Sequence, residues 1–286
     1  MSRARTPLAD ALRERTLTLD GGLGTQLADQ GCDLSGGLWS ARVLAEQPEQ
    51  VAAAHTAYAR AGAQVLITAG YQVDYAAFAR HGYDRRRTTA LLGEAVTLAD
   101  RAARAVEHEV WVAASVGPYG AVLADRSEYR GRYGLSVREL ADFHRPRIEA
   151  LLAAGADVLA LETVPDTDEA RALLSLLAGT GARAWLSYTV AGERTRAGQP
   201  LAEAFALAAA APEVIAVGVN CCAASDVLPA LEAAARTTSK PLLAYPNDAS
   251  GTADWPVAHW RRAGARLIGG CCGVGPRRIA ALAASG

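Results

Sequence analysis

Short apolar runs recur along this chain, and longer amphipathic segments lie between them. The runs are rich in Val, Leu, Ile and aromatic residues and mostly lack polar alternation. This pattern is typical of parallel strands that are buried on both faces. We therefore predict eight strands, at residues 16–19, 64–68, 110–115, 157–161, 184–189, 214–219, 241–244 and 266–268.

The segments between the runs have the periodicity of helices. Over residues 137–152, apolar side chains recur largely at steps of three and four, which places them on one stripe of a helix. The dipeptide Ala-Gly precedes three predicted strands, at residues 61–62, 154–155 and 263–264. An Ala-Gly pair suits a helix C-cap that leads into the next strand.

Eight strands that alternate with about eight helices indicate an α/β protein. No Pro-, Gly- or Ser-rich linker divides the chain, and 286 residues is the usual size of one barrel. We predict a single (β/α)8 TIM-type barrel domain over residues 1–286, with an open doubly wound sheet as the alternative. Residues 117–134 make a long connection and are expected to form an ordered loop on the active face.

Composition narrows the classes of partner. With 51% hydrophobic and 21% charged residues, the chain can build a large core. Its formal net charge of -1 provides no general attraction to nucleic acid or to an anionic membrane. The first residues lack the apolar core of a secretory signal, and the apolar stretch 201–219 is interrupted by Glu203, Pro212 and Glu213. We expect a cytoplasmic protein with no nucleic-acid or membrane partner.

Four of the five cysteines form two adjacent pairs, Cys221-Cys222 and Cys271-Cys272, and each pair follows a predicted strand. Adjacent cysteines make a poor disulfide framework, so reduced thiols are expected. The carboxyl ends of barrel strands lie on one face, where active sites form. Both cysteine pairs should therefore lie on the same face.

Thiolates that meet from two strand ends form a soft, anionic site suited to Zn²⁺. We predict that Cys221, Cys271 and Cys272 bind zinc and are catalytic, leaving a fourth coordination position for a substrate thiolate. Consecutive side chains of an extended chain point in opposite directions, so Cys222 is left out of the ligand set, as is Cys32. The alternative is that the cysteines are small buried apolar residues.

Two acidic residues are expected on the same face. Asp20 is followed by Gly21 and Gly22, whose amides could bind a substrate carboxylate while Asp20 meets an ammonium group. A simple tight turn is the alternative there. Glu162 follows an apolar run and is costly to bury without a cationic partner. That partner could be the ammonium group of an amino acid or, structurally, an arginine.

Seven short motifs along the chain carry a resemblance to a known family. With these motifs the chain resembles the zinc-dependent homocysteine S-methyltransferases, in particular the branch that uses S-methylmethionine. The motifs are DGG at 20–22, ITAGYQ at 67–72, SVGPYG at 115–120, EYRG at 128–131, FHRPR at 143–147, GVNC at 218–221 and GGCC at 269–272.

The resemblance implies a (β/α)8 barrel that holds Zn²⁺ through Cys221, Cys271 and Cys272. It also implies that Asp20 and Glu162 recognise the ammonium group of homocysteine, and that amides near Gly21 and Gly22 receive its carboxylate. Asn220 would be a supporting or substrate-proximal residue. The implied reaction transfers a methyl group from S-methylmethionine, or from S-adenosylmethionine, to the thiolate of L-homocysteine and forms methionine.

One departure concerns the methyl donor. The segment between Asn247 and Trp260 is shorter than the pattern of that family, and it should lie on the active face, where it could alter donor choice. A betaine- or folate-dependent homocysteine methyltransferase, a selenocysteine methyltransferase and a non-catalytic zinc or redox protein remain alternatives. The expected partners are homocysteine and a methyl donor, and the expected assembly is a monomer or a small homo-oligomer.

Overall fold

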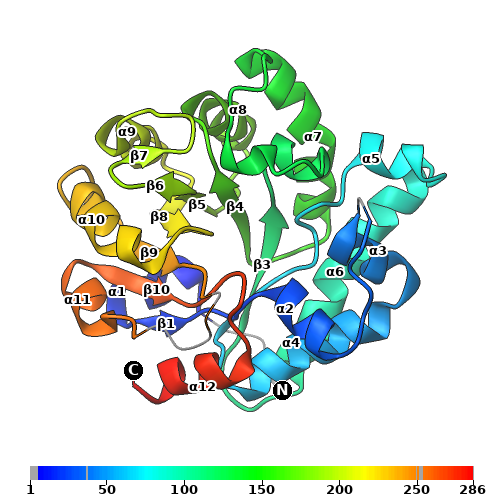
Figure 1. The fold of residues 1–286 in the computed structure, drawn as a ribbon, viewed down its shortest axis with the longest axis horizontal. Coiled ribbons are helices and arrows are strands. Elements are labelled where there is room, and N and C mark those ends of the chain that lie inside the picture. Colours follow the sequence, from blue (N-terminus) through cyan, green and yellow to red (C-terminus); the bar gives the residue numbers. More distant parts are fainter. Residues whose placement is uncertain (1–5, 37, 249, 251–253, 286) are drawn as a thin grey trace.

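Eight parallel strands form the centre of the molecule, which is described by a computed structural model over residues 6–36, 38–248, 250 and 254–285 (Figure 1). In spatial order the strands are β1 (Leu17–Thr18), β10 (Ala265–Ile268), β9 (Leu242–Tyr245), β8 (Val214–Asn220), β5 (Ala184–Tyr188), β4 (Val158–Val164), β3 (Trp111–Val116) and β2 (Val65–Ile67). A parallel bridge between Leu19 and Val65 joins the two ends of this order. The structure is a (β/α)8 TIM-type barrel, so the barrel prediction is confirmed and the open sheet is excluded.

Helices surround the strands and cover the outside of the barrel (Figure 1). The described helices are α1 (Leu8–Glu14), α2 (Leu23–Asp29), α3 (Trp39–Glu46), α4 (Pro48–Arg60), α5 (Tyr75–Arg80), α6 (Arg85–Arg104), α7 (Val137–Ala153), α8 (Thr167–Leu177), α9 (Leu201–Ala210), α10 (Ala224–Ala235), α11 (Val257–Arg262) and α12 (Pro276–Ala284). None of the helices among the described residues is long and apolar enough to cross a membrane.

Apolar side chains form two main cores, one inside the barrel and one between the strands and the helices. Alternate residues along the strands, such as Trp111 and Ala113 or Val158 and Ala160, fill the interior. Their neighbours along the strands, such as Leu159, pack outward into the second core. Helix α1 contributes Leu8, Ala11 and Leu12 to the interior core, where it covers the amino-terminal end of the barrel. The carboxyl end is left for function, as is usual in this fold.

The predicted helix ends are confirmed where Ala-Gly precedes a strand. Ala61, Ala154 and Ala263 are C-caps, and the following glycines have φ of +93°, +76° and +109°. An antiparallel hairpin of β6 (Val190–Ala191) and β7 (Arg194–Thr195) was not predicted. Each of its strands is only two residues long, which is too short for a periodicity to show.

The long connection between β3 and α7 is ordered. It contains two 3-10 helices, η1 (Tyr119–Val122) and η2 (Ser127–Tyr129). The Asp125 carboxylate accepts from the Ser127 amide at 2.9 Å, and the Asp166 carboxylate accepts from the Arg132 amide at 2.9 Å. This loop lies over the carboxyl end of the barrel and supplies side chains to the site described next.

Candidate metal centre and active site

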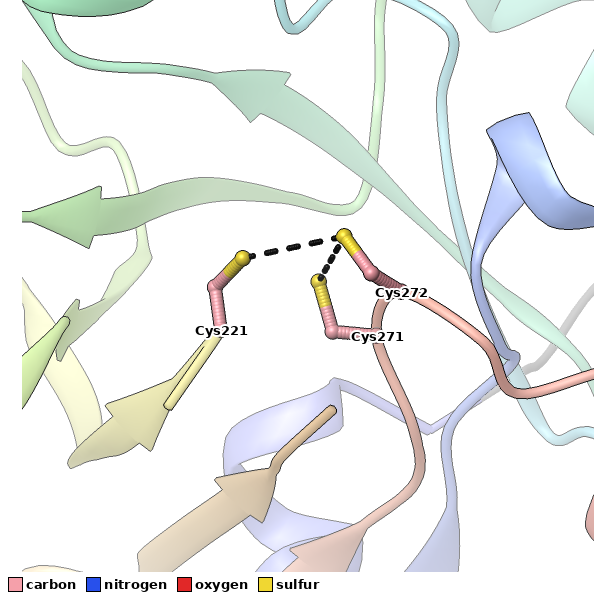
Figure 2. Close-up of side chains that lie close together, drawn as sticks. All are labelled: Cys221, Cys271 and Cys272. Carbon is pink, nitrogen blue, oxygen red and sulfur yellow. Dashed lines mark hydrogen bonds between the residues drawn. The ribbon is translucent and has the colours of Figure 1, made fainter. Parts of the chain in front are cut away.

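The loops after β8 and β10 bring three cysteines together. Cys221 directly follows the last residue of β8, and Cys271 and Cys272 follow β10 in a turn. The turn begins with Gly269, where a Cβ would lie 2.4 Å from the Cβ of Leu19, so only glycine lets the end of β10 pass this close to β1. Figure 2 shows the three side chains pointing toward one another from the two chain segments.

The loop after β9 fastens both cysteine segments. The Cys271 amide donates to the Pro246 carbonyl at 2.8 Å, and the Asn247 amide donates to the Cys222 carbonyl at 2.9 Å. The Asn247 side-chain oxygen also accepts from the Cys272 amide at 3.2 Å. Asn247 therefore connects the two cysteine pairs, a role that its position in the sequence did not reveal.

The three sulfurs have the spacing of a metal site. Cys272 Sγ lies 3.9 Å from Cys221 Sγ and 3.9 Å from Cys271 Sγ, and all three sulfurs lie within 4.8 Å of one another (Figure 2). A tetrahedral Zn²⁺ with Zn–S bonds of about 2.3 Å separates its sulfurs by about 3.8 Å. Three sulfurs at this spacing fit a soft divalent cation with one coordination position left open.

Hydrogen bonds among the thiols favour ionisation of one of them. The thiols of Cys221 and Cys271 hydrogen-bond to the Cys272 sulfur and lower the pKa of Cys272 well below its usual range. A thiolate is the form of cysteine that binds metal. Cys272 is the most exposed of the three, whereas Cys221 is buried, so the sulfur cluster is reached from the side of Cys272.

The backbone at Cys221 determines which member of the first pair enters the site. Cys221 has φ of +50°, in the left-handed region, and this turn directs its side chain toward Cys272. Cys222 is fully buried in the core between strands and helices, where desolvation raises the pKa of its thiol to about 12. Cys32 is partly buried in the loop after α2, away from the cluster.

Asn220 stabilises the neighbouring strand end rather than facing the cavity. Its side-chain oxygen accepts from the Thr163 amide at 2.7 Å, and its side-chain NH₂ donates to Thr163 Oγ1 at 2.7 Å. Thr163 also has a left-handed backbone, with φ of +58°. The pair of hydrogen bonds offsets the cost of that conformation and fixes the ends of β4 and β8 relative to each other.

Tyr129, from the loop between β3 and α7, contacts the metal site directly. Its hydroxyl lies 2.8 Å from Cys221 Sγ. Burial, together with the charge of Cys221, raises the pKa of Tyr129, so the hydroxyl keeps its proton and can donate it to the sulfur. Such a donor to a metal-bound thiolate orients the ligand. No pattern in the sequence around Tyr129 indicates this contact.

A cavity of about 300 Å³ lies at this end of the barrel and includes all three cysteines in its lining. The lining residues include no lysine, arginine or histidine, but they include two glutamates and four aromatic side chains. The acidic and aromatic residues are Glu128, Glu162, Trp39, Tyr71, Tyr129 and Tyr245. With the three cysteines, this lining favours a cationic ligand. A larger cavity, of about 920 Å³, lies at the opposite end near α1 and contains none of these groups.

Asp20 and Glu162 are both buried at the carboxyl ends of their strands. Glu162 Oε1 accepts from the Ser115 hydroxyl at 2.5 Å, and burial raises the pKa of Glu162 to about 7. Asp20 Oδ2 accepts from the Ile67 amide at 2.8 Å, whereas Asp20 Oδ1 is buried without a partner. Burial, with the nearby charge of Glu162, raises the pKa of Asp20. Neither carboxylate has a salt bridge within the described residues, so the structural arginine partner considered for Glu162 is absent there.

Gly21 and Gly22 lie in a tight contact between the first and last loops. A Cβ at Gly21 would lie 2.3 Å from the Val274 carbonyl oxygen, and one at Gly22 would lie 2.5 Å from the Cys271 carbonyl oxygen. The Gly22 amide already donates to the Val274 carbonyl at 3.0 Å. Of the two amides expected to receive a carboxylate, that of Gly22 is therefore engaged, which leaves the Gly21 amide.

A barrel with three clustered cysteine sulfurs at its carboxyl end has the arrangement of a metalloenzyme, and comparisons with known proteins identify the family. A family model described as homocysteine S-methyltransferase matches residues 17–285. The chain is 46% identical to homocysteine S-methyltransferase from Escherichia coli strain K12, over 95% of this chain and 96% of the relative. It is 38% identical to homocysteine S-methyltransferase YbgG from Bacillus subtilis strain 168, over 94% of this chain and 93% of that protein.

A solved structure of a relative, described as metallated, has the same fold. The metallated form of homocysteine methyltransferase MmuM from E. coli has a TM-score of 0.92 and 46% identity, over 98% of this chain and 100% of that one. The chain belongs to the homocysteine S-methyltransferase family and is a methyltransferase. The resemblance to this family inferred from the motifs is confirmed, and the cysteine cluster has the geometry to hold a metal ion.

Proposed function

We propose that this protein transfers a methyl group from S-methylmethionine to L-homocysteine and forms two molecules of methionine, with Zn²⁺ held by Cys221, Cys271 and Cys272. The observation that carries the proposal is one cavity that combines the three-sulfur cluster with two buried glutamates, Glu128 and Glu162, and whose lining lacks basic side chains. Zn²⁺ would lower the pKa of a coordinated thiol, so that homocysteine reaches its thiolate form near neutral pH.

Asp20 and Glu162 would hold homocysteine by its ammonium group. Each is buried without a salt bridge among the described residues, and an ammonium group supplies the missing positive charge. The Ser115 hydroxyl fixes one oxygen of Glu162, and the Ile67 amide fixes one oxygen of Asp20. The amide of Gly21 remains for the substrate carboxylate. These contacts would orient the homocysteine sulfur toward the cysteine cluster.

The chemical step requires positioning more than acid–base catalysis. The homocysteine thiolate attacks the methyl carbon of the sulfonium, and a new C–S bond forms as the old one breaks. The electron pair of the broken bond stays on the donor sulfur, which becomes a neutral thioether, and the thiol proton leaves to solvent. The anionic lining would attract the cationic donor, and Tyr71 and Tyr129 offer aromatic faces to its sulfonium.

The choice of methyl donor is tested directly by turnover. The segment between Asn247 and Trp260 lies partly outside the described residues, at 249 and 251–253. Purified protein with one equivalent of Zn²⁺ should be offered homocysteine with S-methylmethionine, S-adenosylmethionine, betaine or methyltetrahydrofolate, each carrying a ¹³C-methyl group. Methionine measured by mass spectrometry should form fastest from S-methylmethionine. Faster turnover of betaine or the folate would refute the donor assignment, and no turnover with any donor would refute the catalytic function.

A further inference from the structure

Glu128 occupies a second acidic position in the cavity, apart from Asp20 and Glu162. It lies in η2, on the loop between β3 and α7, and its carboxylate lines the same cavity as the three cysteines. The charge of Glu162 acts on Asp20, whereas the charged groups that act on Glu128 are Asp125, Arg126 and Cys272. The cavity thus has two separate acidic groups that share the cysteine cluster.

One oxygen of the Glu128 carboxylate has no hydrogen-bond partner within the described residues. Its side chain is 5% exposed, and its Oε2 atom is buried without a hydrogen bond. Arg126 is exposed and makes no salt bridge to it among the described residues, and burial raises the pKa of Glu128. A buried carboxylate without a partner is costly, so a ligand that brings a cationic N–H donor would relieve that cost.

The loop holds Glu128 in place before any ligand binds. A Cβ at Gly120 would lie 2.4 Å from the Glu128 amide nitrogen, so the two parts of the loop are packed tightly. Ala124, Arg126 and Arg132 have left-handed backbones, with φ of +56°, +65° and +53°. Non-glycine residues in this region are strained, and such strain is common at ligand-binding positions. A preformed position gives affinity and selectivity for the group that fits it.

We propose that Glu128 binds the ammonium group of the methyl donor and so selects a sulfonium that is also an amino acid. This inference rests on the proposed function. Homocysteine and S-methylmethionine each carry one ammonium group, and Asp20 with Glu162 would bind that of homocysteine. Glu128 provides the corresponding position for the second substrate. A quaternary ammonium such as betaine has no N–H to donate, so Glu128 would discriminate against it.

The test compares Glu128→Gln with the parent protein on two sulfonium donors. S-Methylmethionine has an ammonium group, and dimethylsulfoniopropionate has none. For S-methylmethionine, the KM and the Kd from calorimetric titration of the zinc-loaded protein should rise about 10- to 100-fold, the loss expected for a hydrogen bond between charged groups. For dimethylsulfoniopropionate, the two proteins should have equal KM. The homocysteine KM and the zinc content should not change.

Two further variants make the result specific to the Glu128 carboxylate. Glu149→Gln removes an exposed carboxylate on α7, outside the cavity lining, and should behave as the parent protein. Glu128→Asp retains the charge and should recover part of the lost affinity even if Glu128→Gln proves poorly folded.

Three outcomes would overturn the inference while leaving the proposed function intact. These are an unchanged KM for S-methylmethionine, an equal loss with both donors, and a rise in the homocysteine KM instead. In contrast, a parent protein that does not transfer a methyl group from S-methylmethionine would refute the proposed function itself.

Discussion

At the end of β8 only the first cysteine of the pair points into the cavity, whereas after β10 both cysteines do. Cys222 belongs to the core between strands and helices, with a fully buried side chain. Cys272 is exposed to the cavity, and its sulfur lies 3.9 Å from those of Cys221 and Cys271. Two identical dipeptides at the carboxyl end of one barrel therefore place one sulfur and two sulfurs in the cluster.

The backbone explains the difference. At the first pair, the strand ends at Asn220, and the left-handed backbone of Cys221, with φ of +50°, directs its side chain to the cavity while that of Cys222 enters the core. The second pair lies in a turn, in which the Val274 amide donates to the Cys271 carbonyl at 3.1 Å and Gly273 has φ of +82°. A turn lets neighbouring side chains fall on one side. Both pairs lie beyond the ends of their strands, so the local turn at each pair decides how many of its side chains face the cavity.

Alanine substitution of one cysteine in each pair should give the largest difference in metal affinity and activity. Cys271→Ala removes a ligand, so metal affinity and methyl transfer should each fall by more than the roughly 10- to 100-fold that outer-shell changes cost. The matched Cys222→Ala should keep one equivalent of metal and nearly full activity, and should lower the free energy of unfolding by about 1 kcal/mol. Metal analysis, turnover and denaturant unfolding measure these effects. Metal loss in Cys222→Ala would show that the first pair contributes two ligands.

Metal removal should separate the pairs by their reactivity. In the metal-loaded protein, the coordinated sulfurs should react slowly with iodoacetamide. After chelation, Cys271 and Cys272 should be alkylated at least about 10-fold faster, because they become free thiols at an accessible cavity. Cys222 should stay unmodified from pH 7 to pH 9, since its raised pKa of about 12 keeps it protonated throughout that range.

Peptide mass spectrometry assigns the alkylation sites, and Cys32 serves as a reference thiol whose labelling should not depend on metal. Rapid labelling of Cys222 in folded, metal-free protein would contradict the contrast between the pairs.

Substitution of Asn220 should have a smaller effect on metal affinity, and it tests what positions Cys221. Asn220→Ala removes both hydrogen bonds to Thr163 and leaves the Thr163 backbone amide buried without this partner. The free energy of unfolding should therefore fall by about 1–3 kcal/mol. The position of Cys221 should loosen, with an approximately 10-fold loss of metal affinity.

Asn220→Asp keeps an oxygen that can accept from the Thr163 amide. It should therefore lose less stability and less metal affinity than Asn220→Ala. Thermal unfolding and competition with a metal-binding dye measure the two effects. Unchanged metal affinity in a destabilised Asn220→Ala protein would show that the contact with Thr163 stabilises the fold but does not position Cys221.

The eight strands could be predicted because each is a short apolar run buried on both faces. The predicted strand ends were less accurate where the hydrogen-bonded strand extends beyond the apolar run. The run at 157–161 stops at Leu161, but β4 continues to Val164 past the irregular register after Leu161. Helices α2, α3 and α5 lie in connections between strands and add to the predicted alternation.

The cluster of Cys221, Cys271 and Cys272 could be predicted from the sequence because cysteine has distinctive chemistry and the ends of barrel strands share one face. Asp20 and Glu162 could be placed on that face for the same reason. The contact of Tyr129 with Cys221, the unpaired carboxylate of Glu128 and the link made by Asn247 depend on how long loops fold back over the barrel. No periodicity within the loops encodes that path, so only the tertiary structure decided it.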